Sequence, residues 1–128
     1  PVVYTLEIMK VANPLGKRGE DLACAFLEKK GYRIIVRNIK VDRKELDIVA
    51  IYKKTLICIE VKTRSSVLYG TPLEAIGYTK LQRLVTATQI YQASRPDLPE
   101  MIRIDAIEVL YEKGRTEAKI THHENITY

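Results

Sequence analysis

The spacing of apolar residues predicts a helix near the start of the chain. Asn13 can cap this helix, and Pro14 suits its first turn because the missing N–H would be unpaired there in any case. Apolar side chains then recur along one face at helical spacing, and Gly31 provides a C-terminal stop. We therefore predict an amphipathic helix over residues 14–30. Residues 1–12 precede it as an N-terminal arm or an extra strand.

Three segments rich in β-branched residues follow the first helix. They are residues 32–38, 45–52 and 55–62, with short connections at 39–44 and 53–54. Adjacent strands with short links form antiparallel pairs, so we expect a meander.

A second helix and further strands complete the pattern. A capping signature with an early proline predicts a second helical region from residue 71, with Gly77 and Thr79 as a place where it can break and restart, and the helical spacing then continues to about residue 93. The turn-forming segment 94–99 ends it. Residues 101–110 form the next predicted strand, and 118–121 a last one. A strand that follows a helical crossover joins the same sheet in parallel. The predicted fold class is therefore α/β, with an α-β-β-β-α-β core and a mixed central sheet flanked by helices.

Composition narrows the class of protein. The chain has 128 residues, enough for one domain, and 21 Lys plus Arg against 16 Asp plus Glu give a net charge of +5. This net positive charge is compatible with a polyanionic partner and equally with the absence of such a partner. No apolar run approaches the roughly 20 residues of a membrane-spanning helix, and no signal peptide is visible, so we expect a cytoplasmic protein. Cys24 and Cys58 are too few for a disulfide framework, and we expect both to be reduced and buried.

Four charged residues gather at one end of the hairpin formed by the second and third predicted strands. A two-residue or four-residue loop gives the same register, with Asp47 opposite Glu60 and Glu45 opposite Lys62. Alternation places all four on one face. The reverse face is wholly apolar and consists of Leu46, Ile48, Ala50, Ile57, Ile59 and Val61.

Two carboxylates directly opposite each other repel, so this pattern requires a reason. Paired carboxylate oxygens suit a hard divalent cation. Lys62 could then position a water, take its proton, or neutralise charge on a phosphate. The alternative is an ordinary ion pair between Glu45 and Lys62, with Asp47 and Glu60 solvated.

Glu20 is a further candidate acid at the margin of the first helix's apolar stripe. A carboxylate there can reach over the sheet toward Asp47. The alternative is a surface acid in the early turns of the helix, where the helix dipole favours it. His122 and His123 point to opposite sides of a predicted strand, and we expect surface groups rather than metal ligands.

Three stretches in this order carry a family resemblance: G-K-R-G-E-D-L-A at 16–23, K-E-L-D-I-V-A at 44–50 and E-V-K-T-R-S at 60–65. The chain resembles the YraN-type family of predicted endonucleases, within the PD-(D/E)xK nuclease superfamily and similar to archaeal Holliday junction resolvases. The resemblance extends over roughly 13–126. It implies a restriction-endonuclease-like single domain over 13–128.

The resemblance also implies a catalytic set, namely Glu20, Asp47, Glu60 and Lys62. Asp47 and Glu60 would bind Mg²⁺ or Mn²⁺, with the Val61 carbonyl as a third ligand and Glu20 completing the site directly or through water. Lys62 would orient or deprotonate the attacking water, or stabilise developing charge.

Glu45 matches the family's acid before Asp47 and would tune Lys62 or help at a second metal. The chain departs from the family at Lys44, where a glycine is usual, and this lysine can instead contact a phosphate. The basic residues expected to bind nucleic acid are Lys17, Arg18, Lys44, Arg64, Lys80 and Arg83.

The implied activity is hydrolysis of DNA phosphodiester bonds, with branched or damaged DNA among the candidate substrates. The alternative is a non-catalytic nucleic-acid-binding module that keeps the nuclease fold. A homodimer is a further hypothesis, because small nucleases that process two strands often act in pairs.

Overall fold

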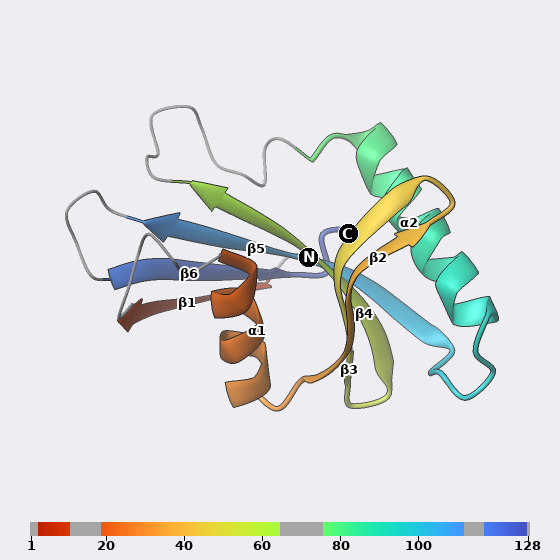
Figure 1. Ribbon diagram of the computed structural model, residues 1–128, viewed down its shortest axis with the longest axis horizontal. Helices are drawn as coiled ribbons and strands as arrows, with labels where there is room; N and C mark the ends of the chain where they lie inside the picture. The colour runs from red at the N-terminus through yellow and green to blue at the C-terminus, as the bar shows by residue number, and fades with distance from the viewer. Residues whose placement is uncertain (1–2, 11–18, 65–75, 112–116, 128) are drawn as a thin grey trace.

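The computed structural model describes residues 3–10, 19–64, 76–111 and 117–127. Within these ranges six strands form one sheet in the order β1-β6-β5-β4-β3-β2, and two helices cover its faces (Figure 1). The elements are β1 (Val3–Lys10), α1 (Gly19–Lys29), β2 (Arg33–Val41), β3 (Lys44–Tyr52), β4 (Thr55–Arg64), α2 (Tyr78–Ala93), β5 (Met101–Tyr111) and β6 (Glu117–Glu124).

The topology confirms the predicted α/β class and the α-β-β-β-α-β order. Strands β2, β3 and β4 form the expected antiparallel meander, and β5 joins β4 in parallel after the crossover through α2. Strand β1 pairs antiparallel with β6, so residues 3–10 form an edge strand of the sheet rather than a loose arm. The predicted helix starts at Pro14 and at 71–74 lie outside the described residues. Gly77 caps α2, which begins at Tyr78, so the predicted break at Gly77 is confirmed.

Strand β2 is longer than the sequence predicts. Residues 39–41, expected in a connection, continue the ladder with β3 as far as the pair Val41↔Lys44. Only Asp42 and Arg43 remain as the turn, and both have positive φ, at 45° and 68°. Two-residue hairpin turns commonly need residues with positive φ, and glycine or asparagine is the usual choice. Asp and Arg adopt positive φ less readily, so the residue types at 42–43 did not indicate a turn.

The core lies in two layers, one on each face of the sheet. Phe26 and Leu27 of α1 pack with Ile48 and Ile59 on one side, and Leu84 of α2 packs within a separate cluster on the other. Both cysteines are free and buried, as predicted. Burial raises the pKa of Cys24 to about 11 and of Cys58 to about 12, so neither thiol is reactive near neutral pH.

The start of α1 lies directly against the end of β4. A side chain at Gly19 would collide with the hydroxyl of Thr63, so a residue without a Cβ is needed for this approach. The close packing brings the next residue, Glu20, to the same end of the sheet as Glu60 and Lys62.

The predicted assignment of hairpin side chains to the two faces of the sheet is wrong at Leu46. Alternation along β3 predicts Leu46 beside Ile48, but Leu46 packs in the cluster under α2 and Ile48 in the cluster under α1. The backbone explains this difference. Asn38 of β2 has φ of 53° and lies across from Asp47 in the register, so the hairpin bends there and its end turns toward α2.

Candidate active site

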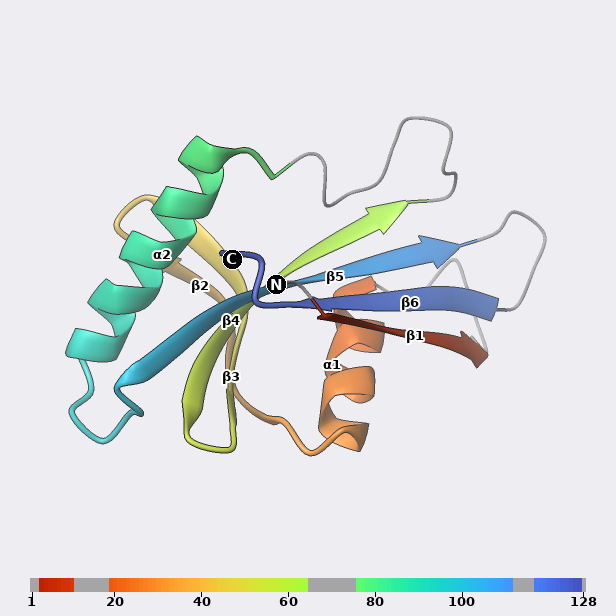
Figure 2. The ribbon, with the colours of Figure 1, turned by 180° about the vertical axis from the view of Figure 1, so that it is seen from behind.

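The strands β3 and β4 separate at Asp47. Within residues 44–64 their antiparallel register runs from Tyr52↔Thr55 to Ile48↔Ile59 and ends there. Beyond this point the backbone N–H of Val61 donates to Oδ2 of Asp47 at 2.8 Å. Figure 2 shows β4 continuing beside β5 while the β2–β3 hairpin turns toward α2. The carboxyl group of Asp47 therefore lies where the two strands diverge.

Glu60 of β4 is the most buried acid of this region, with 4% of its surface exposed. Its Oε1 lies 3.4 Å from Nζ of Lys62 and 3.1 Å from Nζ of Lys80. Its Oε2 is buried and has no hydrogen-bond partner among the described residues. A buried carboxylate oxygen without a partner is costly, because burial removes the water that would otherwise solvate it.

The side chain of Asp47 is also partly buried, and this burial changes the pKa of its carboxyl group. Burial raises its pKa from 3.8 to about 6, against the hydrogen bond from Val61, which lowers it. The nearby charges of Glu60 and Glu20 raise this pKa further. A desolvated acid whose ionised form is disfavoured by neighbouring acids is a suitable setting for a divalent cation, whose charge would stabilise that form.

Lys62 and Lys80 contact the same oxygen of Glu60, one from β4 and one from α2. Hydrogen bonding with Lys80 and burial lower the pKa of Lys62, and the charge of Glu60 opposes the shift. The direction is that of a lysine able to exchange a proton closer to neutral pH. Lys80 was expected to bind nucleic acid. In the structure its ammonium group forms an ion pair with Oε1 of Glu60.

Glu20 lies near Asp47, as predicted, but its side chain is already engaged. Its Oε1 accepts hydrogen bonds from Nε of Arg37 at 3.0 Å and Nδ2 of Asn38 at 2.7 Å. No group of three His, Cys, Asp or Glu in the described part of the chain is close enough to hold a metal ion. The candidate metal site therefore consists of Asp47 and Glu60, with Glu20 nearby and held by Arg37 and Asn38.

The predicted pairing of Glu45 with Lys62 is wrong. Glu45 is exposed and pairs with Lys40 of β2, because β3 has already left β4 at that point. Lys62 lies instead next to Glu108 in the parallel register with β5. Val61, predicted as a carbonyl ligand, contributes its N–H to Asp47.

The predicted basic surround is described only in part. Lys17 and Arg18 lie outside the described residues. Lys44 and Arg83 both line a groove beside α2, and Arg64 ends β4.

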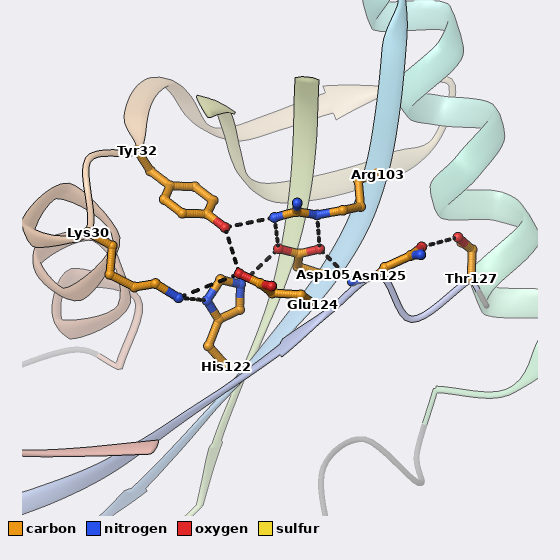
Figure 3. A network of polar contacts seen from close by, with 8 residues as sticks. All are labelled: Lys30, Tyr32, Arg103, Asp105, His122, Glu124, Asn125 and Thr127. Atoms are coloured by element: carbon orange, nitrogen blue, oxygen red, sulfur yellow. Dashed lines mark hydrogen bonds and ion pairs between the residues drawn. The ribbon is translucent and has the colours of Figure 1, made fainter. Parts of the chain in front are cut away.

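The assignment of His122 as a surface group is wrong, since it is fully buried. Its Nε2 lies 2.8 Å from Oδ2 of Asp105, and its Nδ1 lies 2.8 Å from Nζ of Lys30 (Figure 3). A carboxylate can only accept, so Nε2 carries the proton and Nδ1 accepts from Lys30. The imidazole is therefore neutral in this arrangement.

Asp105 is the centre of this buried network. It accepts two hydrogen bonds from Arg103 at 2.9 Å each, one from His122 and one from the backbone N–H of Asn125 at 2.9 Å. Although burial raises the pKa of Asp105, these hydrogen bonds outweigh it and hold that pKa below its usual value. Arg103 also donates to the Tyr32 hydroxyl at 2.7 Å (Figure 3). The network joins β5 and β6 to the C-terminal end of α1.

The sequence contains a signal for this network that pairs of acids alone do not reveal. Arg103 and Asp105 are two residues apart in a strand, so they share a face, and Ile107 and Val109 further along that face are apolar. A charged pair on a buried face needs partners. The only nearby polar residues on the next strand are at 121–124, which include His122.

Comparison with known proteins shows which protein family this chain matches. The model of the uncharacterised protein family UPF0102 matches residues 19–109. A UPF0102 protein of Flavobacterium psychrophilum is 45% identical over 116 residues, which cover 91% of this chain and 95% of its own. Those of Caldanaerobacter subterraneus subsp. tengcongensis and Chlorobium phaeobacteroides are each 40% identical, over 84% and 90% of this chain and 89% and 94% of their own. These matches confirm the YraN-type resemblance at the level of the family.

Proposed function

The chain belongs to the uncharacterised protein family UPF0102, and for this member we propose a metal-dependent endonuclease that hydrolyses phosphodiester bonds in DNA. The observation that carries the proposal is the Oε2 atom of Glu60, which is buried and has no hydrogen-bond partner among the described residues. It lies beside a second desolvated acid, Asp47. Such a pair fits a hard cation better than it fits a purely structural role.

Asp47 and Glu60 would hold Mg²⁺ or Mn²⁺ in this proposal. The bound ion would neutralise negative charge on the phosphodiester and polarise its phosphorus–oxygen bonds. Glu20 has a positioning role, because Arg37 and Asn38 fix its carboxylate close enough to Asp47 to raise the pKa of that acid.

Lys62 is the proposed proton acceptor. Hydrogen bonding with Lys80 and burial lower the pKa of Lys62, which is the direction required of an amine that takes a proton from water. The resulting hydroxide attacks phosphorus, the bond to the leaving oxygen breaks, and that oxygen takes a proton from solvent. Lys80 keeps a positive charge beside Glu60 throughout.

Cleavage assays test the proposal on linear, nicked and four-way DNA with Mg²⁺ or Mn²⁺. We expect the wild-type protein to cleave at least one of these substrates, and Lys62→Met to be slower by about a hundredfold, the usual contribution of a positioned base. Lys119→Met is the matched control, because Lys119 is an exposed lysine on β6, and it should cleave at the wild-type rate. Equal rates for the Lys62 variant and the wild type would refute the assigned role.

A non-catalytic nucleic-acid-binding module is the second candidate function. It is favoured by the ammonium of Lys80, which lies 3.1 Å from Oε1 of Glu60 and can neutralise this acid without a metal.

Calorimetry with Mn²⁺ separates the two candidates. The nuclease proposal expects the wild-type protein to bind Mn²⁺ and Glu60→Gln to lose this binding. Glu28→Gln, at an exposed acid on α1, is expected to bind as the wild type does. No heat of binding in the wild type, together with salt-sensitive DNA binding in EDTA, would favour the binding module instead.

A further inference from the structure

A groove of about 700 Å³ opens between the Asp42–Arg43 turn and helix α2. Its two walls come from elements that also carry residues of the candidate active site. On one wall, Lys44 begins the strand that carries Asp47. On the other, Thr79 precedes Lys80, whose ammonium contacts Glu60. The groove and the two proposed metal ligands are therefore linked through β3 and α2.

The groove is positively charged. Its charged lining residues are Arg43, Lys44 and Arg83 against the single carboxylate of Asp42. None of the three cations forms an ion pair within the described part of the chain, whereas Arg37, Arg95 and Arg103 elsewhere all do. Unpaired cations around a concave surface are the usual setting for phosphate groups.

The turn that forms one rim of the groove has an unfavourable backbone. Arg43 has φ of 68°, in the left-handed region where glycine or asparagine is the usual choice for such a turn. An arginine with this backbone conformation lowers the stability of the fold. Among the described residues, its side chain makes no contact that would offset this loss. Strain of this kind concentrates where a side chain has a function, which here is to bring a guanidinium to the rim of the groove.

The opposite rim carries an exposed aromatic ring. Tyr78 begins α2 and is 69% exposed, the largest exposed fraction among the large hydrophobic residues of the described chain. Inside duplex DNA the faces of the bases are covered by their neighbours, so away from a duplex end an exposed ring can stack only on an unpaired base. The groove thus offers cations for a backbone and a flat surface for one base.

We propose that this groove binds an unpaired strand of nucleic acid, with phosphates between Arg43, Lys44 and Arg83 and a base stacked on Tyr78. The inference takes the proposed action on DNA as its premise, and it names the substrate class as DNA with a single-stranded segment next to the cleaved bond. Gapped, flapped or branched DNA has such a segment, and a perfect linear duplex does not.

Binding of fluorescent oligonucleotides in EDTA tests this inference without cleavage. The probes are a 12-nucleotide single strand, the same sequence as a blunt duplex, and a duplex with a single-stranded tail. We expect the wild type to prefer the single strand and the tailed duplex. Tyr78→Ala should weaken binding of these two probes by about tenfold, as loss of one stacked base does, while Tyr78→Phe keeps it.

Arg43→Gly is the second variant, and it guards against a loss of binding through unfolding. Glycine suits the left-handed backbone at this position, so the variant should be at least as stable as the wild type and yet bind the single strand more weakly. Met101→Ala removes a residue that is 68% exposed at a site outside the groove, and it should bind every probe as the wild type does.

The outcomes separate this inference from the proposed nuclease activity. Weaker single-strand binding in both variants, with loss of the single-strand preference in Tyr78→Ala, supports the groove even where no DNA is cleaved. Unchanged single-strand binding in both overturns the groove even where the wild type is an active nuclease. Equal weakening of single-stranded and blunt duplex probes by Tyr78→Ala also overturns it, because the ring then does not recognise an unpaired base. Absence of binding to any probe by the wild type overturns the groove as well.

Discussion

Replacing Asp105 by asparagine is expected to lower the free energy of unfolding by about 3–5 kcal/mol, the usual cost of leaving a buried charge without its partner. Asp105 is fully buried and accepts four hydrogen bonds, from Arg103, His122 and the backbone of Asn125. Asparagine keeps the shape but presents an NH₂ group to donors and removes the charge that balances Arg103. The loss is a large fraction of the roughly 5–15 kcal/mol that stabilises a typical domain.

Urea denaturation of the metal-free protein measures this effect. Asp97→Asn is the matched control, because Asp97 pairs with Arg95 at the surface, and there we expect no measurable change. A fall in the midpoint for Asp105→Asn with an unchanged denaturant slope would place the effect in the native state. If both variants unfolded at the same urea concentration, the network around Asp105 would have no stabilising role.

This network also shows where sequence reasoning succeeds and where it ends. Periodicity was enough to predict both helices, the meander and the parallel strand β5, because each depends on local apolar spacing. The contact between Lys30 and His122 joins residues 92 positions apart, and no local pattern encodes such a pair. A rule based on position near the end of the chain therefore predicted an exposed histidine where the structure has a buried one.

The candidate site shows the same division between local and non-local information. The register of the β3–β4 hairpin follows from its two-residue turn, and it was predicted correctly as far as Ile48↔Ile59. The separation of the strands beyond that pair depends on the kink at Asn38 and on packing of the hairpin end against α2. The sequence thus identified Asp47 and Glu60 as neighbours. It could not predict that Lys62 lies away from Glu45 or that Lys80 contacts Glu60.

Asp47→Asn is expected to make the metal-free protein more stable at pH 8 while slowing DNA cleavage by about a thousandfold, the loss expected when a metal ligand is removed. The stability gain follows from the pKa of Asp47, which burial raises from 3.8 to about 6. Between these two values the folded protein binds more protons than the unfolded chain. The free energy of unfolding therefore falls as the pH rises through this window.

The size of the gain is set by that difference in pKa. A shift of about two units corresponds to at most about 3 kcal/mol, and partial access of water reduces it to an expected 1–2 kcal/mol, to order of magnitude. Asparagine has no charge to desolvate at any pH, and its carbonyl oxygen can still accept the hydrogen bond from the N–H of Val61. We therefore expect the variant to exceed the wild type in stability above pH 6 and to match it below pH 4.

Urea titrations in EDTA at pH 4, 6 and 8 measure the pH dependence, and Glu45→Gln, at an exposed acid on the same strand, should show no such pH-dependent gain. A lower stability of Asp47→Asn at pH 8 would mean that the ionised carboxylate is favourable in the folded protein, contrary to the burial described here. A gain in stability without loss of cleavage would leave Asp47 desolvated but outside the catalytic machinery. Only the combination of greater stability and lost cleavage identifies a residue that is kept ionised, at a cost to the fold, for the cation it would hold.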